Sequence, residues 1–206
     1  MLFPATTPHT VLDGELGSVR YFPNAAPPQE HAAWFAWLHA NAPWGAFRRQ
    51  MYEREVVVPR LVCGYELDDP ELPPTLHAAR AVCERVAGQA FTSVGMNLYR
   101  DGNDSVAPHN DRLDDLIPGA PIALLSLGDT RRLVLATKAA PKRRLALDLE
   151  PGSVLVMSYD TQLHLDHGVP KTRTPVGPRI SLAFRARPPK DERRGVRRPR
   201  YVPLAQ

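Results

Sequence analysis

A short motif near the middle of the chain, His109-Asn110-Asp111, places an imidazole and a carboxylate two positions apart. On an extended backbone, side chains two positions apart point to the same face, so both groups would reach the same point in space. They are two of the three ligands in the 2-His-1-carboxylate sites of non-haem Fe(II) oxygenases. Two exposed polar loop residues are the simpler explanation of so short a motif. A metal site therefore needs a third ligand from elsewhere in the sequence.

Candidates for this third ligand lie in the segment Leu163–Pro170, which contains His164 and His167. We place His167 in a loop that follows the strand-like run at residues 153–158 and precedes the last strand. His164 is the competing choice. A lone histidine is more often a hydrogen-bonded structural residue than a ligand, so these residues alone leave the alternatives open.

The segment Arg179–Arg185 alternates strictly between two kinds of residue, which is typical of a strand. Ile180, Leu182 and Phe184 form one face, which we assign to the core of a β-sandwich. The other face carries two arginines, about 20 Å apart at their Cα atoms by strand rise. Burying two guanidinium groups is unfavourable without anions, and a small ligand with two carboxylates would supply them. Two hydrated surface arginines are the alternative.

The strand-like run Val94–Tyr99 leads toward the His-X-Asp motif and alternates in the same way. Asn97 and Tyr99 share one face of this run, and Met96 and Leu98 share the other. Because an amide and a phenol are suitable donors to a carboxylate, this strand is expected to contribute to the same ligand site.

Two helices precede the region of alternating residues. The first is predicted over residues 27–40, with Trp34 and Trp37 on an apolar face that we assign to the core. The second is predicted over residues 74–87 and ends at Gly88. Helices that come first in the chain would cover one face of a sheet, which gives an α+β layered domain.

The segment between the helices, residues 42–74, is rich in proline, glycine and acidic turns. We predict loops and edge structure there, with one strand-like run at residues 54–60. After Gly88 the spacing of apolar residues changes to a period of 2, which is typical of strands in a sandwich or jelly roll. The predicted strands lie at residues 18–22, 92–99, 122–127, 132–137, 144–149, 153–158 and 179–185.

Composition bounds the class of protein. The chain has 206 residues, of which 43% are hydrophobic and 23% charged, as in a soluble globular protein. No run of about 18 apolar residues and no secretory signal is recognisable, so we expect no membrane partner. The two cysteines, Cys63 and Cys83, are too few for a disulfide framework or a Cys-rich zinc site, which favours a cytoplasmic location.

Positive charge is concentrated near the end of the chain. The segment Arg185–Arg200 contains eight Lys or Arg and two acidic residues, whereas the whole chain has a net charge of +4. Such a segment can bind a phosphate backbone, and a solvated tail without a partner is the alternative.

Five segments of the chain together resemble the AlkB family of Fe(II)- and 2-oxoglutarate-dependent dioxygenases, which have a double-stranded β-helix fold. The resemblance keeps its order and spacing over roughly residues 55–186. The segments are Asn97–Gly102, His109–Asp111, Pro121–Gly128, His167–Lys171 and Arg179–Arg185.

The resemblance implies a role for each matching residue. The Fe(II) ligands would be His109, Asp111 and His167. The residues that hold 2-oxoglutarate would be Asn97, Tyr99, Arg179, Ser181 and Arg185. The substrate-binding residues would be Arg60 and Tyr65, in a nucleotide-recognition lid that starts near residue 56, and Leu113. The reaction would use O2 and 2-oxoglutarate to hydroxylate a C–H bond, which in this family is often an N-methyl group on a base.

Two positions and one segment depart from the family pattern. Ser181 stands where the family commonly has asparagine. Leu113 stands where nucleic-acid dealkylases usually carry an acid, and a leucine cannot accept a hydrogen bond from an exocyclic amine. Asp114 or Asp115 could replace that acid if the loop bends. The aromatic-rich part of the lid is also short, so the base would have to stack on Trp44, Tyr52 or Tyr65.

These observations predict a dioxygenase with three regions: an N-terminal helical and lid region at 1–88, a jelly-roll core at 89–187 and a basic tail at 188–206, in one structural domain. Oxidative dealkylation of DNA or RNA is the leading function, and we expect a monomer. A hydroxylase or demethylase of a protein or small molecule is the first alternative. A non-catalytic nucleic-acid-binding module is the second.

Overall fold

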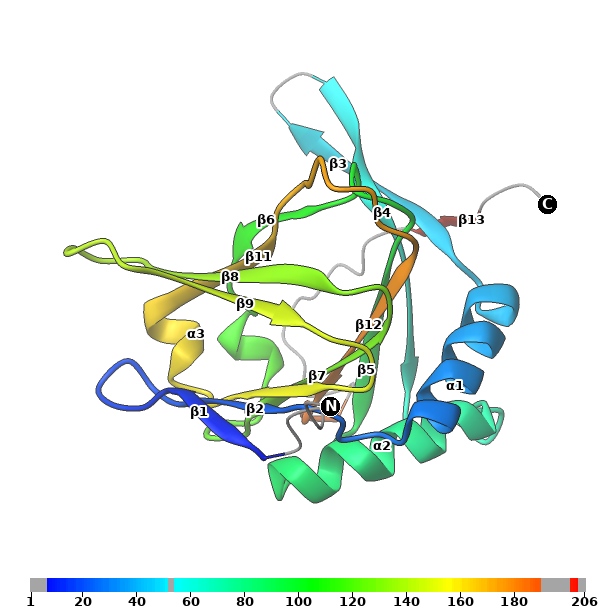
Figure 1. The fold of residues 1–206 in the computed structure, drawn as a ribbon, viewed down its shortest axis with the longest axis horizontal. Coiled ribbons are helices and arrows are strands. Elements are labelled where there is room, and N and C mark those ends of the chain that lie inside the picture. The colour runs from blue at the N-terminus through cyan, green and yellow to red at the C-terminus, as the bar shows by residue number, and fades with distance from the viewer. Residues whose placement is uncertain (1–6, 52–53, 190–200, 204–206) are drawn as a thin grey trace, which may run out of the picture.

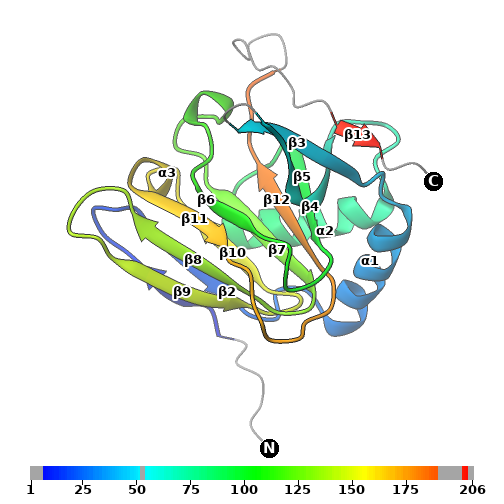
Figure 2. The same ribbon diagram turned by 90° about the horizontal axis from the view of Figure 1, so that it is seen from above.

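The computed structural model describes residues 7–51, 54–189 and 201–203. Two antiparallel sheets face each other, and the helices α1 (Pro28–Asn41) and α2 (Pro74–Ala87) cover the outer face of the larger sheet (Figures 1 and 2). This arrangement confirms the predicted α+β fold with N-terminal helices on one sheet of a jelly roll. None of the helices in the described ranges is long and apolar enough to cross a membrane.

The larger sheet has nine strands. In spatial order they are β1 (His9–Leu12), β2 (Val19–Phe22), β10 (Val154–Met157), β7 (Ile122–Gly128), β12 (Arg179–Arg185), β5 (Ser93–Tyr99), β4 (Arg54–Glu66), β3 (Gly45–Met51) and β13 (Tyr201–Pro203). The smaller sheet has the order β6 (Val106–His109), β11 (Leu165–Val169), β8 (Arg131–Thr137) and β9 (Arg144–Leu149). A single 3₁₀ turn (Leu113–Asp115) and the short helix α3 (Thr161–His164) complete the described elements.

Two apolar clusters lie on the two faces of the larger sheet. One lies between the sheets and includes Leu124, Leu135 and Leu155. The other lies under α1 and α2 and includes Ile180 and Leu182 of β12. Our assignment of these β12 residues to the sandwich interior was therefore wrong. The polar face of β12 points between the sheets instead, because the helices bury the apolar face.

Both predicted helices are present, but only part of the predicted face of α1 is buried. Trp34 is 7% exposed and belongs to the helix-side cluster, whereas Trp37 is 39% exposed. The assignment of Trp37 to the core was wrong. In α2 the predicted stop is confirmed, since Gly88 ends the helix in the left-handed conformation with φ of 67°.

The region predicted as irregular between the helices is largely a hairpin. β3 and β4 pair with each other, and β4 pairs with β5, so the hairpin extends the larger sheet (Figure 1). Two further strands of the site region, β6 and β11, also lacked a sequence prediction. His167 lies on β11 rather than in a loop.

The two α1 tryptophans provide a test of the helix-side packing. Trp34→Ala is expected to lower the free energy of unfolding by about 3–5 kcal/mol, because it opens a cavity under the helix. Trp37→Ala serves as the matched control and should cost no more than about 1–2 kcal/mol, since much of this side chain remains in water. Urea unfolding of the two variants measures both values, and equal losses would contradict the packing described here.

Candidate active site

Two histidines meet on the smaller sheet. His109 ends β6 and lies opposite His167 of β11 in the strand register, and their ring centroids are 4.5 Å apart. The Nδ1 of His109 lies 2.9 Å from the carbonyl oxygen of Ala107, which can only accept a hydrogen bond. This contact fixes the proton on Nδ1 and leaves Nε2 free to bind a metal.

The third predicted ligand, Asp111, follows β6 directly. Its backbone N–H donates to Oε1 of Gln162 at 3.0 Å. Its carboxylate accepts two hydrogen bonds from Arg185 on the opposite sheet, from Nε at 3.0 Å and from Nη2 at 2.9 Å. Arg185 thus reaches across the sandwich and holds Asp111 near the two histidines.

The electrostatics of these groups suit a metal site. Burial acts to raise the pKa of Asp111, but the positive charge of Arg185 and the proximity of His167 hold that pKa below its usual value. Burial, together with the neighbouring His109, lowers the pKa of His167 to about 4. At neutral pH the site therefore presents an ionised carboxylate and a neutral imidazole, which are the forms that bind metals.

Among the described residues, no three His, Cys, Asp or Glu side chains already surround a point that would suit a metal ion. The carboxylate of Asp111 is turned to Arg185, and a metal would have to share it. Two imidazoles and one carboxylate nevertheless form the ligand set of non-haem Fe(II) sites, so the residues fit iron by their chemistry.

A second polar group lies at the start of β12. Arg179 is 1% exposed, and its Nε and Nη2 donate to Oγ of Ser126 on β7, at 3.1 and 2.6 Å. Its Nη1 is buried with no hydrogen-bond partner in the described part of the chain. An unpaired donor on a buried cation is costly, and a carboxylate from a ligand would remove that cost. This orphaned donor fits 2-oxoglutarate at the end of β12 away from Asp111.

The other predicted co-substrate residues lie next to these groups. In the register of β5 and β12, Arg179 is paired with Tyr99 and Ser181 with Asn97. Oδ1 of Asn97 accepts a hydrogen bond from Nε of Arg60 at 2.7 Å. Arg60, which we predicted in the substrate lid, therefore contacts the predicted co-substrate group.

The remaining residues that we predicted to bind the substrate do not lie together. Tyr65 packs against the helix-side cluster, on the face of β4 away from Asn97, so the structure does not bring it to the other predicted site residues and its substrate role stays a prediction. Trp44 also packs there, and Tyr52 lies outside the described residues. Leu113 starts the 3₁₀ turn after Asp111. In this turn Asp115 is buried, and its Oδ1 has no partner among the described residues.

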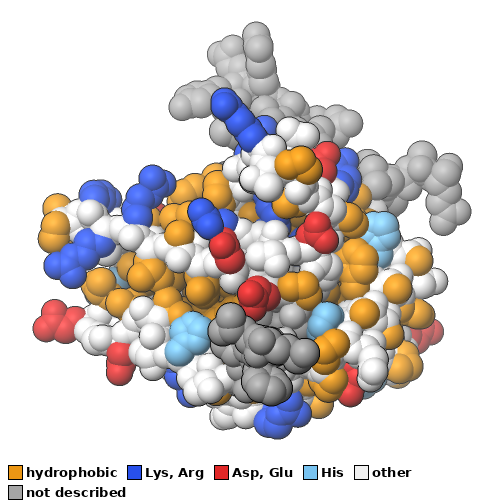
Figure 3. Space-filling view, in the orientation of Figure 1, with side chains coloured by type: hydrophobic (Ala, Val, Ile, Leu, Met, Phe, Trp, Pro, Cys, Tyr) orange, Lys and Arg blue, Asp and Glu red, His pale blue; other side chains and the backbone are white. Residues whose placement is uncertain are grey.

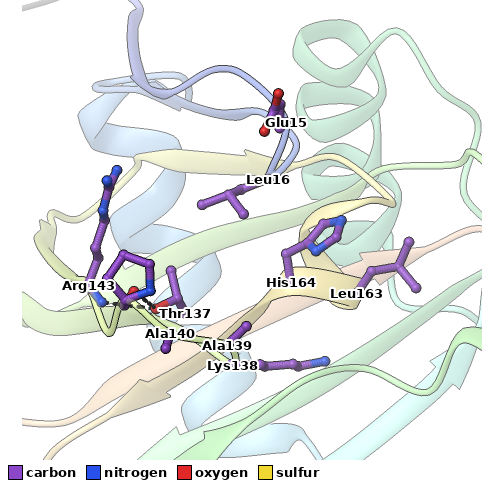
Figure 4. Close-up of a pocket in the computed structure, with 10 residues that line it drawn as sticks. Glu15, Leu16, Thr137, Lys138, Ala139, Ala140, Arg143, Leu163 and His164 are labelled. Carbon is purple, nitrogen blue, oxygen red and sulfur yellow. Dashed lines mark hydrogen bonds between the residues drawn. The ribbon is translucent and has the colours of Figure 1, made fainter.

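His164 is exposed and lies in a different place from the buried His167. It lies on the wall of a pocket of about 300 Å³ between α3, the β8–β9 hairpin and the loop before β2, together with Leu16 and Thr137 (Figure 4). No residue of the His109 group lines this pocket. The structure therefore brings His167 and not His164 to His109.

This placement gives a direct test of the third ligand. His167→Ala is expected to lower Fe(II) affinity and turnover by at least about 100-fold. Mutation of residues that only hydrogen-bond to metal ligands already lowers metal affinity or activity 10–100-fold. His164→Ala should leave both within about twofold. Fe(II) titration and succinate formation measure the effects, and the reverse order would identify His164 as the ligand.

Sequence reasoning missed three residues that support the site: Ser126, Gln162 and Arg131. Each is buried, and each contacts a predicted site residue or its neighbour through a hydrogen bond or a ring contact. Ser126 had a usable signal, because it is the one polar residue within the apolar run of β7. Gln162 lies in a segment without a clear pattern, and Arg131 directly precedes the strand predicted at residues 132–137, beside a second arginine.

Comparison with known proteins places these features in a family. The family model described as the 2OG-Fe(II) oxygenase superfamily matches residues 18–185. Human DNA oxidative demethylase ALKBH2 is 38% identical over 119 residues, which cover 54% of this chain and 46% of that protein. Human alpha-ketoglutarate-dependent dioxygenase alkB homolog 3 is 34% identical over 125 residues, covering 57% of this chain and 44% of that protein. The match thus spans about half the length of these relatives.

Solved structures support the fold. The structure of OsALKBH1 superposes with a TM-score of 0.60 at 15% identity, covering 81% of this chain and 97% of that chain. A Pseudomonas putida prolyl-4-hydroxylase superposes with a TM-score of 0.56 at 18% identity, covering 84% and 94%. At these identities the likeness concerns the fold alone.

Proposed function

Because this chain belongs to the 2OG-Fe(II) oxygenase superfamily and is AlkB-like within it, we propose that it oxidatively dealkylates N-alkylated bases in DNA or RNA. The family uses Fe(II), 2-oxoglutarate and O2. The observation that carries the proposal is the arrangement of two histidines and an Arg185-bound aspartate on one side of the sandwich, with a buried, incompletely paired Arg179 on the other.

The roles of this chain's residues follow from their contacts. His109, His167 and Asp111 would hold the iron, and Gln162 and Arg185 fix the position of Asp111. Arg179, Tyr99 and Asn97 would hold the far carboxylate of 2-oxoglutarate, the one that does not bind the iron, between the sheets. The bound iron and 2-oxoglutarate supply the activation of O2, with release of succinate and CO2. The buried surroundings of His167 and Arg179 exclude water from that chemistry.

Surface charge supports a nucleic-acid substrate. Lys and Arg side chains gather along the projecting β8–β9 hairpin (Figure 3), where Lys142, Arg143 and Arg144 are exposed. Such a cluster attracts a phosphate backbone. The basic segment predicted from the sequence lies largely in residues 190–200, outside the described residues. A base in a duplex would have to leave the stack to reach the buried site.

Leu113 favours a second candidate of the same chemistry, a hydroxylase or demethylase of a protein or small molecule. Leu113 is half-buried next to Asp111, and its side chain offers no acceptor to the exocyclic amine of a base. A non-catalytic nucleic-acid-binding module would need neither the iron ligands nor Arg179. The predicted cytoplasmic location, monomeric state and three-region division stay predictions.

Mass spectrometry of methylated oligonucleotides tests the proposal. We expect the protein, with Fe(II), 2-oxoglutarate and ascorbate, to remove methyl groups from 1-methyladenine or 3-methylcytosine in DNA or RNA. The loss should require both His109 and 2-oxoglutarate, so His109→Ala is the matched control. Succinate formation without any change in the oligonucleotides would favour the protein or small-molecule alternative. Iron binding without succinate from any substrate would favour the non-catalytic module.

A further inference from the structure

A second buried arginine lies near Arg179. Arg131, at the start of β8 in the smaller sheet, is 2% exposed. Its Nη1 donates to the carbonyl oxygen of Asp101 at 2.8 Å, and its Nη2 donates to those of Asp104 and Pro170, each at 2.8 Å. These three carbonyls belong to the turn after β5 and to the chain just after β11. They hold the guanidinium group in one place and link the two segments.

Arg131 and Arg179 both contact the ring of Tyr99. The guanidinium carbon of each lies 5.4 Å from the ring centroid, within the range of a cation–π contact. Tyr99 is buried on β5. Its ring contacts Arg179 of the larger sheet on β12 and Arg131 of the smaller sheet on β8. The position of the phenol therefore depends on Arg131 as well as on Arg179.

Within the described part of the chain, neither guanidinium group donates a hydrogen bond to a carboxylate. Arg131 bonds to carbonyls and Arg179 to Ser126. The nearby Asp104 carboxylate already accepts two bonds from the Arg100 side chain, both at 2.8 Å. Burial is the main cause that lowers the pKa of Arg179 to about 10, and the charge of Arg131 adds to it. This end of the site carries two buried positive charges that an anion would stabilise.

We propose that Arg131 is a positioning residue for the far carboxylate of 2-oxoglutarate. It holds the Tyr99 ring beside Arg179 and adds a second fixed positive charge to that end of the site. Because its three carbonyl contacts fix it before the ligand arrives, little ordering remains to oppose binding. The inference rests on the proposed use of 2-oxoglutarate, and it does not depend on what the enzyme oxidises.

Calorimetric titration with Mn(II) in place of Fe(II) tests this role without turnover. We expect Arg131→Met to weaken 2-oxoglutarate binding about tenfold, which corresponds to about 1.4 kcal/mol. Oxalate can chelate the metal but has no far carboxylate, so its affinity should stay within about twofold. Arg132→Met is the matched control, because Arg132 is the exposed neighbour that pairs with Asp148. It should leave the affinities for both ligands unchanged.

Equal weakening of 2-oxoglutarate and oxalate would overturn the proposal, because it would show a general distortion of the metal site. So would unchanged 2-oxoglutarate binding together with a lower Tm, since Arg131 would then only hold the two segments together. If Arg131→Met does not fold, Arg131→Lys carries the test. It keeps the charge but cannot make all three carbonyl bonds and the ring contact, so a smaller loss for 2-oxoglutarate alone is expected. A failure to dealkylate nucleic acid would not affect these titrations, which contain none.

Discussion

Replacing Asp111 with alanine is expected to lower iron-dependent turnover by at least about 100-fold and to destabilise the protein as well. Turnover is expected to fall because a predicted iron ligand is removed. Mutation of residues that only hydrogen-bond to metal ligands already lowers metal affinity or activity 10–100-fold. The loss of stability has a separate cause. Asp111 accepts both fork hydrogen bonds of Arg185, whose side chain is 12% exposed. Removing one partner of a buried pair costs about 3–5 kcal/mol, since the other charge remains buried.

A double variant separates these two effects. Asp111→Ala with Arg185→Met removes both charges, and we expect it to recover most of the lost unfolding free energy while turnover stays absent. Asp114→Ala is a control for the stability of the loop alone, because Asp114 is exposed three positions further on and is itself a candidate substrate residue. Urea unfolding and succinate formation are measured on all variants. Retained turnover in Asp111→Ala would exclude Asp111 as a ligand. A double variant no more stable than Asp111→Ala would show that the unpaired charge of Arg185 is not the cause of the lost stability.

The two faces of β12 show what alternation predicts and what it leaves undetermined. A period of 2 correctly separates Arg179 and Arg185 from Ile180 and Leu182, because successive side chains point to opposite faces. It cannot say which layer each face meets. β12 lies in the middle of a sheet covered on both sides, so Arg179 is as buried as Leu182 and the Arg185 side chain is only 12% exposed. Only the tertiary structure places the arginines between the sheets.

Glycine and proline explain where strands near the predicted site were missed or predicted too short. Gly168 suggests a turn, but it lies in β11, where an added Cβ would come within 2.9 Å of the carbonyl oxygen of Val106 on β6. Its role is the close approach of these two strands, which brings His167 to His109. In β4 the predicted strand-like run ends at residue 60, just after Pro59, although the strand continues to Glu66. A local pattern cannot distinguish a glycine for close packing from a glycine in a turn.

Polar partners were predictable only where they contrast with their neighbours along the chain. Ser126 contrasts with the apolar residues around it in β7, whereas Arg131 is followed by another arginine that is exposed and paired with Asp148. Nothing local distinguishes the buried arginine from the exposed one. Their difference arises from the pleat of β8, which turns one toward Tyr99 and the other toward solvent.

Replacing Arg179 with methionine is expected to raise the KM for 2-oxoglutarate by about 100-fold, the equivalent of about 2.7 kcal/mol. Loss of a buried charged partner to a ligand carboxylate costs about 2–5 kcal/mol in comparable interfaces. The variant should fold at least as well as the parent protein without ligand, because it removes a buried cation whose Nη1 has no partner among the described residues. Replacing a buried ionic group by an apolar one of similar volume is often neutral or stabilising.

Succinate formation at varied 2-oxoglutarate concentration measures the KM, and thermal unfolding with and without 2-oxoglutarate, in the presence of Mn(II), measures ligand binding and ligand-free stability. At a ligand concentration 100 times Kd the parent protein gains about 2.7 kcal/mol, whereas the variant at the same concentration should gain about 0.4 kcal/mol. Arg179→Lys should fall between them, because an ammonium keeps the charge without the planar fork. A large loss of stability in ligand-free Arg179→Met would show that the hydrogen bonds to Ser126 matter more than the orphaned donor. An unchanged KM would mean that the far carboxylate binds elsewhere, and the two buried arginines around Tyr99 would then need another anion.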